Sequence, residues 1–548
     1  MNAERLLALY EQVAEAPDAV PRMRRFVLDL AVRGKLVAQD PTDEPASELL
    51  ERIAVARENA PKSGRSGKKK HADPSLTELP FALPKGWSRT LLSELVRVVN
   101  GRAYKKPELL DEGTPVLRVG NLFTSDHWYY SKLELEDDKY CDKGDLIYAW
   151  SASFGPFIWD GPRVIYHYHI WKLPLFSESA LDKQFLYLFL LQKTREIKDA
   201  GHGISMVHMT KEKMEQLAAP LPPLAEQRRI VAKVEELMAL LDRLEAARTE
   251  REATRDRLTA TSLARLTAPY ADPAEFLTRA RFALDTLPAL TARPDQIKPL
   301  RQTILNLAVR GMLVDQDSAE RTVDLPDQGM REVAEGKLDF KLPNRWRWAL
   351  VSEVASSRLG KMLDKAKNRG APFPYLRNTN VHWFEIRIDE LKEILLTEND
   401  AAEYLLESGD VLICEGGHGI GRTAVWRGSS APMSFQKALH RIRVGEYLSP
   451  NFFSFCCFVY FHEGIMQTYF TGVGIPHFTG RALSRLLFPL PPLAEQHRIV
   501  ARVDALMALC DRLEAALATA DTTRTRLLEA LLHEALTPVP EAMTEAAE

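Results

Sequence analysis

Two pairs of long internal repeats constrain this chain of 548 residues more than any other feature. Residues 220–247, PLPPLAEQRRIVAKVEELMALLDRLEAA, match residues 489–516, PLPPLAEQHRIVARVDALMALCDRLEAA, at 23 of 28 positions. Upstream of each block, RRFVLDLAVRGKLVAQD at 24–40 matches RQTILNLAVRGMLVDQD at 301–317 at 11 of 17 positions. Chance does not produce such agreement, and a long repeat fixes the architecture before any local feature. The chain therefore contains two copies of one scaffold.

The segments between the repeats have diverged but stay in register. LPKGW at 83–87 corresponds to LPNRW at 342–346. Short runs such as TPVLRVGNL and GDVLICE, bounded by Gly, Pro and Asp, indicate β-strands, and a helical stretch follows them at 181–197 and at 451–469. Two similar scaffolds therefore carry two different mixed α/β modules.

Each PLPPLAEQ block opens an amphipathic helix. Apolar residues follow a 4-3-4-3 spacing at Ile230, Val234, Leu237, Leu241 and Leu244, and again from Ile499. This spacing indicates a coiled-coil seam. Proline cannot lie inside a helix, so the helices should begin near Leu224 and Leu493. Near-identity of the two copies favours mutual pairing of the seams; the alternative is two amphipathic helices packed separately into two globular cores.

The repeats and composition shifts predict seven segments. They are an N-terminal helical region at 1–60, a basic flexible linker at 61–79, a first variable module at 80–220, a central helical region with a coiled-coil helix at 221–317, a linker at 318–339, a second variable module at 340–488, and a C-terminal coiled-coil helix at 489–548. The stretch PKSGRSGKKKH within the basic linker holds five Lys or Arg and no acid. It is either a solvated linker or an arm that contacts phosphates.

Composition excludes several classes of protein. The net charge is -3, so any surface for a polyanion must be local. The five cysteines contain no CxxC pair, which argues against a zinc ribbon or a disulfide framework. The N-terminus lacks a basic, apolar signal sequence, and the longest apolar run, Phe452–Phe461, is far shorter than the ~20 residues of a membrane span. We therefore expect a cytoplasmic protein outside the membrane.

The sequence lacks the motifs of the catalytic classes considered. It contains no NPPY or DPPY tetrapeptide of an adenine methyltransferase and no G-x-x-x-x-G-K-[ST] loop of a motor ATPase. The glycines of 416–421 do not have dinucleotide-binding spacing, and a loop that touches a partner's backbone or a plain turn fits them better. His167 and His169 alternate, but no third metal ligand has a clear spacing. We expect no catalytic residue and no metal site.

The whole pattern resembles the specificity subunits of type I restriction-modification enzymes. The resemblance rests on paired divergent modules joined by repeated PLPPLAEQ and LAVRG helices, and it covers nearly the whole chain. It implies that each module is a target recognition domain that reads one half of a split DNA site. The predicted fold is mixed α/β, with two globular target recognition domains separated by long antiparallel coiled-coil helices in an internal pseudo-twofold repeat.

The resemblance also implies which molecules this chain works with. The partners are double-stranded DNA, two methyltransferase (modification) subunits and restriction or translocase subunits. S-adenosylmethionine, ATP and Mg²⁺ are expected on those subunits, and no cofactor is expected in this chain, which is a non-catalytic subunit. Two other hypotheses compete: a coiled-coil adaptor that assembles proteins without DNA sequence specificity, and a self-contained methyltransferase or nuclease, which would bind its cofactor alone.

Candidate DNA-binding residues are polar or aromatic side chains at predicted strand ends and in Gly-containing loops, where recognition residues tend to lie. Base edges are read by hydrogen-bonding side chains, whereas Lys and Arg on phosphates supply affinity. The candidates are Tyr104, Lys105, Lys106, Arg118, Asn121, Trp150, Ser151, Ser153, His208 and Lys211 in the first module, and Lys361, Arg377, Asn380, Glu415, His418, Arg422, Gln436, Lys437, His477 and Arg481 in the second.

Two subsets of the candidates have a competing structural interpretation. Arg118 with Asn121 recurs as Arg377 with Asn380, so structural support is favoured there over sequence reading. His208, which corresponds to His477, precedes the helix that leads to PLPP. A structural hydrogen bond or phosphate contact is favoured for both histidines over a catalytic role. Base specificity is expected where the modules differ.

Overall fold

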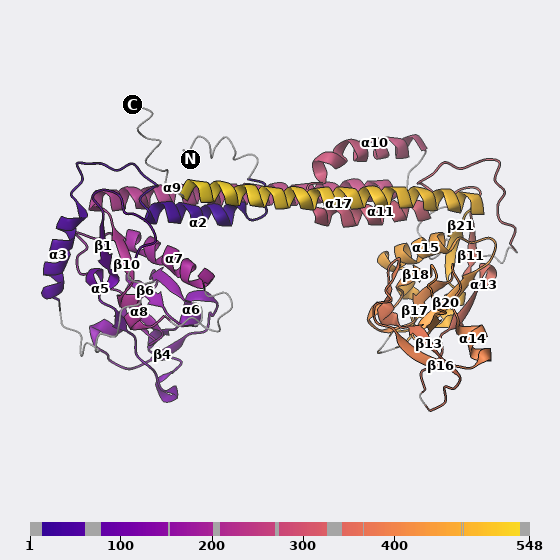
Figure 1. The fold of residues 1–548 in the computed structure, drawn as a ribbon, viewed down its shortest axis with the longest axis horizontal. Helices are drawn as coiled ribbons and strands as arrows, with labels where there is room; N and C mark the ends of the chain where they lie inside the picture. The colour runs from indigo at the N-terminus through magenta and orange to yellow at the C-terminus, as the bar shows by residue number, and fades with distance from the viewer. Residues whose placement is uncertain are drawn as a thin grey trace. The chain divides into compact units, whose positions relative to one another are not determined.

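The computed structural model describes residues 14–60, 78–151, 154–200, 209–268, 273–325, 342–364, 366–472, 474 and 476–536. The chain forms two compact units: unit 1 comprises Met1–Glu250 with Asp521–Glu548, and unit 2 comprises Arg251–Ala520. Each unit contains one variable module, module 1 or module 2, together with parts of both long helices (Figure 1). Residues 61–77 of the predicted basic linker lie outside the described residues.

Module 1 is a mixed α/β domain built on two four-stranded sheets. Their strand orders are β2-β9-β6-β7 and β4-β3-β8-β5, and the antiparallel pair β1 and β10 joins the entry and exit of the module. The elements are β1 (Ser88–Leu91), α5 (Leu92–Leu95), β2 (Val99–Asn100), β3 (Thr114–Leu117), α6 (Val119–Phe123), β4 (Tyr129–Ser131), β5 (Tyr140–Cys141), β6 (Leu146–Ala149), β7 (Gly155–Ile158), β8 (Val164–Tyr166), β9 (Ile170–Lys172), α7 (Lys183–Ala200), α8 (Lys211–Glu215) and β10 (Ala218–Leu221).

Module 2 has a four-stranded main sheet like that of module 1, but its second sheet has three strands, in the order β16-β13-β19, and β14 pairs separately with β15. Its main sheet has the order β12-β20-β17-β18, and β11 pairs with β21 as β1 pairs with β10. The elements are β11 (Arg347–Leu350), α13 (Val351–Val354), β12 (Ala355–Leu359), β13 (Ala371–Leu376), β14 (Val381–His382), β15 (Glu385–Ile386), β16 (Lys392–Leu396), α14 (Glu398–Tyr404), β17 (Val411–Cys414), β18 (Thr423–Val425), β19 (Ser434–Phe435), β20 (Leu439–Val444), α15 (Pro450–His462), α16 (Gly480–Ser484) and β21 (Leu487–Leu490).

The scaffold is helical. It consists of α2 (Ala19–Val32), α3 (Ala46–Glu58), α9 (Leu224–Thr267), α10 (Pro273–Leu290), α11 (Ile297–Val309) and α17 (Leu493–Leu536). The long helices α9 and α17 have 44 residues each and begin at the predicted residues. The mixed α/β class with two modules, long helices and an internal repeat is thus confirmed.

One predicted helix boundary is wrong. The helical stretch expected at 451–469 ends as α15 at His462, and a 3₁₀ turn at Met466–Tyr469 follows. Gly464 has φ +78°. A glycine in the left-handed region commonly terminates a helix, because it has no Cβ to clash with the backbone.

The seam of each long helix packs against the shorter repeat helix of its unit. In unit 1, Ile230 and Val234 of α9 share a core with Val27 and Leu28 of α2 and with Phe185 of α7. In unit 2, the equivalent seam residues of α17 belong to the core that contains α11 and α15. The 4-3-4-3 spacing therefore joins the scaffold to its module within each unit.

Helix α9 begins in unit 1 and ends in unit 2, whereas α17 begins in unit 2 and ends in unit 1. In unit 1, Leu528 and Leu531 of α17 pack with Ala19 of α2, and Arg22 of α2 pairs with Glu529 at 2.6 Å. In unit 2, Arg293 pairs with Asp256 of α9 at 2.9 Å. Each unit is therefore completed by both copies of the repeat.

The repeated motifs meet at one contact in each unit, which we call the joint. In unit 1 the indole N–H of Trp87 donates to the buried carboxylate of Glu226 at 2.9 Å, and in unit 2 Trp346 donates to Glu495 at 3.0 Å. The next residue, Gln227, accepts from the backbone N–H of Asp182 at 2.7 Å and donates to the carbonyl of Pro222 at 2.9 Å. LPKGW and PLPPLAEQ are therefore recurrent because together they hold the start of the long helix.

The glycine of LAVRG completes the joint. Gly34 has φ +66°, and a Cβ there would lie 2.4 Å from the Pro84 ring and 2.9 Å from the Trp87 ring. Gly311 has φ +71° and would approach Pro343 and Trp346 in the same way. Glycine is required here for both its conformation and its lack of a side chain. The three repeated motifs therefore form one structural unit.

The first prediction concerns this packing. An alanine with positive φ costs about 1–3 kcal/mol, and overlap in a packed site adds about 1–3 kcal/mol. Gly144 is the matched control, because its φ is +92° and nothing lies within 4 Å of its would-be Cβ. We expect Gly34→Ala to lower the free energy of unfolding of the full chain more than Gly144→Ala, measured by denaturant titration. Equal losses would contradict the packing role of Gly34.

A second prediction follows from the charge of the joint. Burial raises the pKa of Glu226, although the bond from Trp87 opposes the shift. The unfolded state then loses its proton first as pH rises above about 4.5, so the wild-type chain loses stability up to the raised pKa. Glu226→Gln keeps an acceptor for the indole but does not titrate. The free energy of unfolding of this variant minus that of wild type should therefore increase as pH rises over that range, measured by denaturant titration. A difference that stays constant or decreases would contradict the burial effect.

Candidate nucleic-acid interface

A concave surface of module 2 gathers residues from five separate segments. Its volume is about 400 Å³, and it includes four predicted residues, Glu415, Gln436, Lys437 and His477. The remaining lining residues are Met362, Leu363, Asn378, Gly416, Gly417 and Ala438. Polar groups of opposite charge and an amide thus converge beside two exposed apolar side chains, Met362 and Leu363. Such a mixture suits hydrogen bonding to a polar ligand edge.

Backbone hydrogen bonds hold these segments together. The N–H of Glu415 donates to Ala438 O at 2.9 Å, and the N–H of Lys437 donates to Lys361 O at 2.9 Å. The N–H of Gln436 donates to Leu376 O at 3.0 Å. Because main-chain groups build this frame, its side chains can change without dismantling it.

Module 1 has the same frame with other side chains. The N–H of Trp150 donates to His169 O at 3.0 Å, as Glu415 does to Ala438. The N–H of Tyr168 donates to Arg102 O at 3.0 Å, and the N–H of His167 donates to Leu117 O at 2.9 Å. Trp150 therefore stands at the position of Glu415, and His167, Tyr168 and His169 stand at the positions of Gln436, Lys437 and Ala438.

Sequence reasoning missed Arg102, Tyr168 and the two histidines as interface residues. His167 and His169 were considered as metal ligands on a strand, whereas they lie in the turn between β8 and β9. The correspondence of Leu117 with Leu376 was the sequence signal that could have located this turn. Leu117 pairs with Tyr166 and Leu376 with Phe435, which places the next residue of each module in the same turn.

The module 1 surface is aromatic. The Trp150 ring stacks on Trp171 with centroids 5.6 Å apart, and its indole N–H donates to Tyr168 O at 2.8 Å. Tyr104 stacks on His167 at 6.3 Å, and the Arg102 guanidinium lies 5.2 Å from the Tyr104 ring centroid. Ser151, which follows Trp150 after the end of β6, is half-buried. Aromatic rings of this kind supply rigid contact area together with polar edges.

The imidazoles of this surface favour the uncharged form. Burial lowers the pKa of His167 to about 4, with further lowering by His169 and Arg118, and burial also lowers the pKa of His169. Burial raises the pKa of Tyr104 to about 12. A neutral imidazole offers one donor and one acceptor, so these groups can form directed hydrogen bonds without attracting phosphates.

Positive charge lies beside the aromatic surface. Lys105 and Lys106 are exposed and directly follow Tyr104. Arg102 makes two hydrogen bonds to Glu108, at 3.0 and 2.7 Å, and the backbone N–H of Lys105 also donates to Glu108 at 2.7 Å. The loop that carries the two lysines is thereby fixed.

The recurring asparagines have structural hydrogen bonds. Asn121 accepts from the N–H of Arg118 at 3.2 Å and donates to His127 O at 2.8 Å. Asn380 accepts from the N–H of Arg377 at 2.9 Å and donates to Arg387 O at 2.9 Å. The geometry supports the structural interpretation of both asparagines. The Arg118 guanidinium stacks on Tyr129, and Arg377 donates to Glu390 O.

The remaining candidates are dispersed. Lys211 of α8 lies 3.6 Å from Glu215, and Lys361 pairs with Asp400. Arg481 of α16 and His418 are exposed, and Arg422 is half-buried. Ser153 and His208 lie outside the described residues. Of these, the module 2 residues Lys361, His418, Arg422 and Arg481 do not line the surface that holds Glu415 and Gln436. The binding roles of all seven residues stay predictions.

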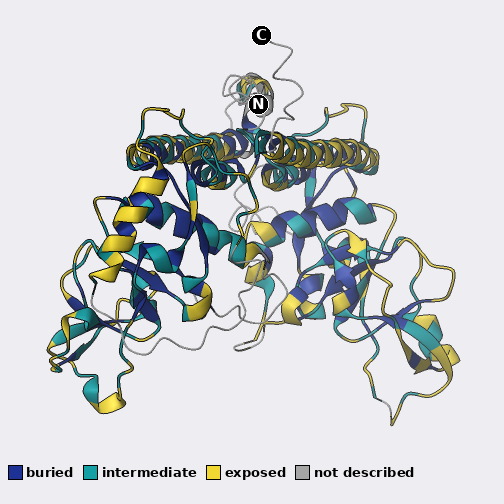
Figure 2. Cartoon of the chain, turned by 60° about the vertical axis from the view of Figure 1, so that its left-hand side comes forward, coloured by how far each residue is buried: buried dark blue, intermediate teal, exposed yellow. Residues whose placement is uncertain are grey.

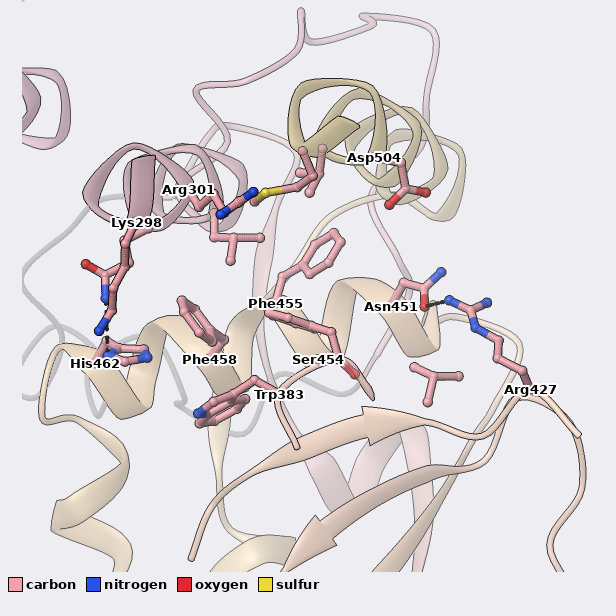
Figure 3. Close-up of a pocket in the computed structure, with 16 residues that line it drawn as sticks. Lys298, Arg301, Trp383, Arg427, Asn451, Ser454, Phe455, Phe458, His462 and Asp504 are labelled. Atoms are coloured by element: carbon pink, nitrogen blue, oxygen red, sulfur yellow. Dashed lines mark hydrogen bonds between the residues drawn. The ribbon is translucent and has the colours of Figure 1, made fainter. Parts of the chain in front are cut away.

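A second cavity of unit 2 has a different character. It measures about 610 Å³ and lies between the scaffold helices α11 and α17 and the module helix α15 (Figure 3). Aromatic side chains including Trp383, Phe455 and Phe458 line it, and Arg301 at its edge pairs with Glu514 at 2.8 Å. None of the predicted DNA-binding residues lines this cavity. We therefore place the candidate interface on the module surface.

The described part of the chain holds neither a metal-binding cluster nor a membrane-spanning helix. No group of three or more His, Cys, Asp or Glu residues there could hold a metal ion. Within the same residues, no helix combines the length and apolar character needed to cross a membrane. All five cysteines are buried and free.

Comparisons with known proteins give a consistent result. The family model described as "Type I restriction modification DNA specificity domain" matches residues 84–253 and 343–520, more than half of the chain. The specificity subunits of the Escherichia coli type I restriction enzymes EcoAI and EcoEI are 28% and 27% identical to the chain, with 94% of each protein covered. The solved HsdS subunit from Thermoanaerobacter tengcongensis is 21% identical, with a TM-score of 0.43, over 84% of this chain and 99% of that one.

The third prediction separates structural residues from binding residues. Asn380→Ala removes two hydrogen bonds that a buried side chain makes to the backbone of Arg377 and Arg387, which should cost about 1–3 kcal/mol of unfolding free energy. Lys437→Ala removes an exposed amine and should change stability by less than about 0.5 kcal/mol. Denaturant titration measures both. An Asn380→Ala variant of unchanged stability and altered DNA sequence preference would overturn the structural role.

Proposed function

We propose that this chain, which belongs to the type I restriction-modification DNA specificity family, selects the DNA sequence on which a restriction-modification complex acts. The observation that carries this function is the shared backbone frame with different side chains. One frame presents His167 and Tyr168, and the other presents Gln436 and Lys437. Base edges are distinguished by such differences in donors, acceptors and apolar contacts. The recognised site is therefore bipartite and asymmetric, with one half read by each module.

The chain is a non-catalytic subunit in this proposal. S-adenosylmethionine is bound by methyltransferase subunits, and ATP and Mg²⁺ by restriction or translocase subunits. The histidines and carboxylates of the candidate interface then bind and discriminate DNA, and no step of methyl transfer or strand cleavage is assigned to them. The complete assembly works in the cytoplasm on double-stranded DNA.

Two copies of one modification subunit fit the repeated scaffold. Each long helix has a row of exposed residues along one side (Figure 2). Leu240 is 53% exposed and its repeat counterpart Leu509 is 51% exposed. The identity of this exposed position in both repeats, while the modules have diverged, supports equivalent docking of two identical partners.

The fourth prediction tests this function in the host. Single-molecule sequencing of genomic DNA should find a bipartite methyladenine motif when this chain and its methyltransferase partner are present. The motif should vanish when the gene for this chain alone is deleted, and it should return when the gene is restored. The methyltransferase gene stays intact in every strain, so that loss of the motif cannot result from loss of the catalytic partner's gene.

Two results would contradict the proposal. Methylation of the same motif after deletion would show that another protein supplies the specificity. A complex of this chain with its partner that binds all DNA sequences equally would favour the adaptor hypothesis instead.

A further inference from the structure

The turn between β8 and β9 occupies a fixed position in module 1. A Cβ at Gly101 would lie 2.3 Å from the carbonyl oxygen of His167. In module 2, a Cβ at Gly360 would lie 2.1 Å from the carbonyl oxygen of Gln436. Gly101 follows β2 and Gly360 follows β12. Because glycine has no side chain, the backbone at these two positions can contact the backbone of the turn directly. The side chains of both turns therefore start from equivalent points.

The two turns present different chemical groups from those points. Module 2 offers an amide at Gln436, an ammonium group at Lys437 and a methyl group at Ala438, with the carboxylate of Glu415 beside them. An amide can pair with adenine, an ammonium group with guanine, and a carboxylate with the amino group of cytosine. Module 1 offers imidazole, phenol and imidazole at the same three positions. The pattern of donors, acceptors and apolar contacts is therefore different at each position.

Trp150 has a supporting role in this arrangement. Its indole N–H already donates to the carbonyl of Tyr168, and its ring is stacked on Trp171. The edge of the ring system meets His169, with centroids 5.0 Å apart and planes at 88°. Tyr168 itself is 39% exposed. Trp150 thus positions the turn, and Tyr168 is the group of the turn that reaches outward.

We infer that the turn His167–His169 is the specificity-determining element of module 1 and that Gln436–Ala438 is its counterpart in module 2. The inference rests on the proposed function and adds where in each module the bases are discriminated. In module 1 the discrimination is made by uncharged rings. In module 2 it is made by an amide and a charged group at the same backbone positions.

Exchange of the turns tests the inference. The full chain would be purified with its partner subunits in four forms: wild type, the triple variant His167→Gln/Tyr168→Lys/His169→Ala, the single variant Lys437→Tyr, and the control Lys132→Ala. Lys132 lies in module 1, and its exposed side chain pairs with Glu112 outside the turn. Binding would be selected from two DNA libraries, each randomised in one half of the wild-type site. Thermal unfolding and subunit assembly would be recorded for every form.

The expected result is a change confined to one half-site for each exchange. The triple variant should lose about tenfold or more of its discrimination in one half and keep wild-type discrimination in the other. Lys437→Tyr should change the other half, and Lys132→Ala should change neither. If the triple variant binds too weakly to select, Tyr168→Lys alone should still broaden the same half-site.

Other outcomes overturn the inference. Wild-type discrimination in a folded, assembled triple variant would show that the turn does not read bases. Loss of discrimination in both halves would show that the turn supports the whole complex. Absence of any sequence preference in the wild-type complex would instead overturn the proposed function, so the two failures are distinguishable.

Discussion

The buried hydrogen bond from a tryptophan indole to a glutamate carboxylate is the contact on which each half of the molecule depends. Trp87 with Glu226, and Trp346 with Glu495, fasten the first turn of a long helix to the strand that enters a module. A buried carboxylate is costly unless it is hydrogen-bonded, so loss of the indole would leave a penalty rather than a neutral gap. Gly34 and Gly311 allow this contact by leaving space for the proline and tryptophan rings.

The joint separates what must stay constant from what can vary. Residues that fix the direction of the long helices lie in the repeats, and they are held by side-chain bonds that only a few residue types can make. Inside the modules, backbone bonds hold the candidate interface, as at Trp150 with His169 and Glu415 with Ala438. Side chains on a backbone frame can be replaced at small cost in stability. The side chains of the candidate interface can therefore change while the scaffold that holds each module stays the same.

Much of this organisation could be predicted from the sequence. The repeats located the scaffold, the prolines placed the starts of α9 and α17, and short β-rich runs indicated the mixed α/β class of the modules but not their strand order. The sequence could not show that the seam of α9 packs on α2, because an apolar stripe does not identify the helix against which it packs. Glu415, Gln436 and His477 were identified individually, but their convergence depends on sheet register. Tyr168 was not predicted, because only the backbone hydrogen bonds of the two modules show that it stands at the position of Lys437.

A module graft followed by methylome sequencing would show directly whether each module reads one half of the site. Residues 92–217 would replace residues 351–486, because the N–H of Leu92 donates to Leu217 O at 2.8 Å and that of Val351 donates to Leu486 O at 3.1 Å. Both joints then remain intact, and each carries the same reading surface. We expect the methylated motif to become two inverted copies of one half-site. An unchanged asymmetric motif from an assembled complex would contradict it.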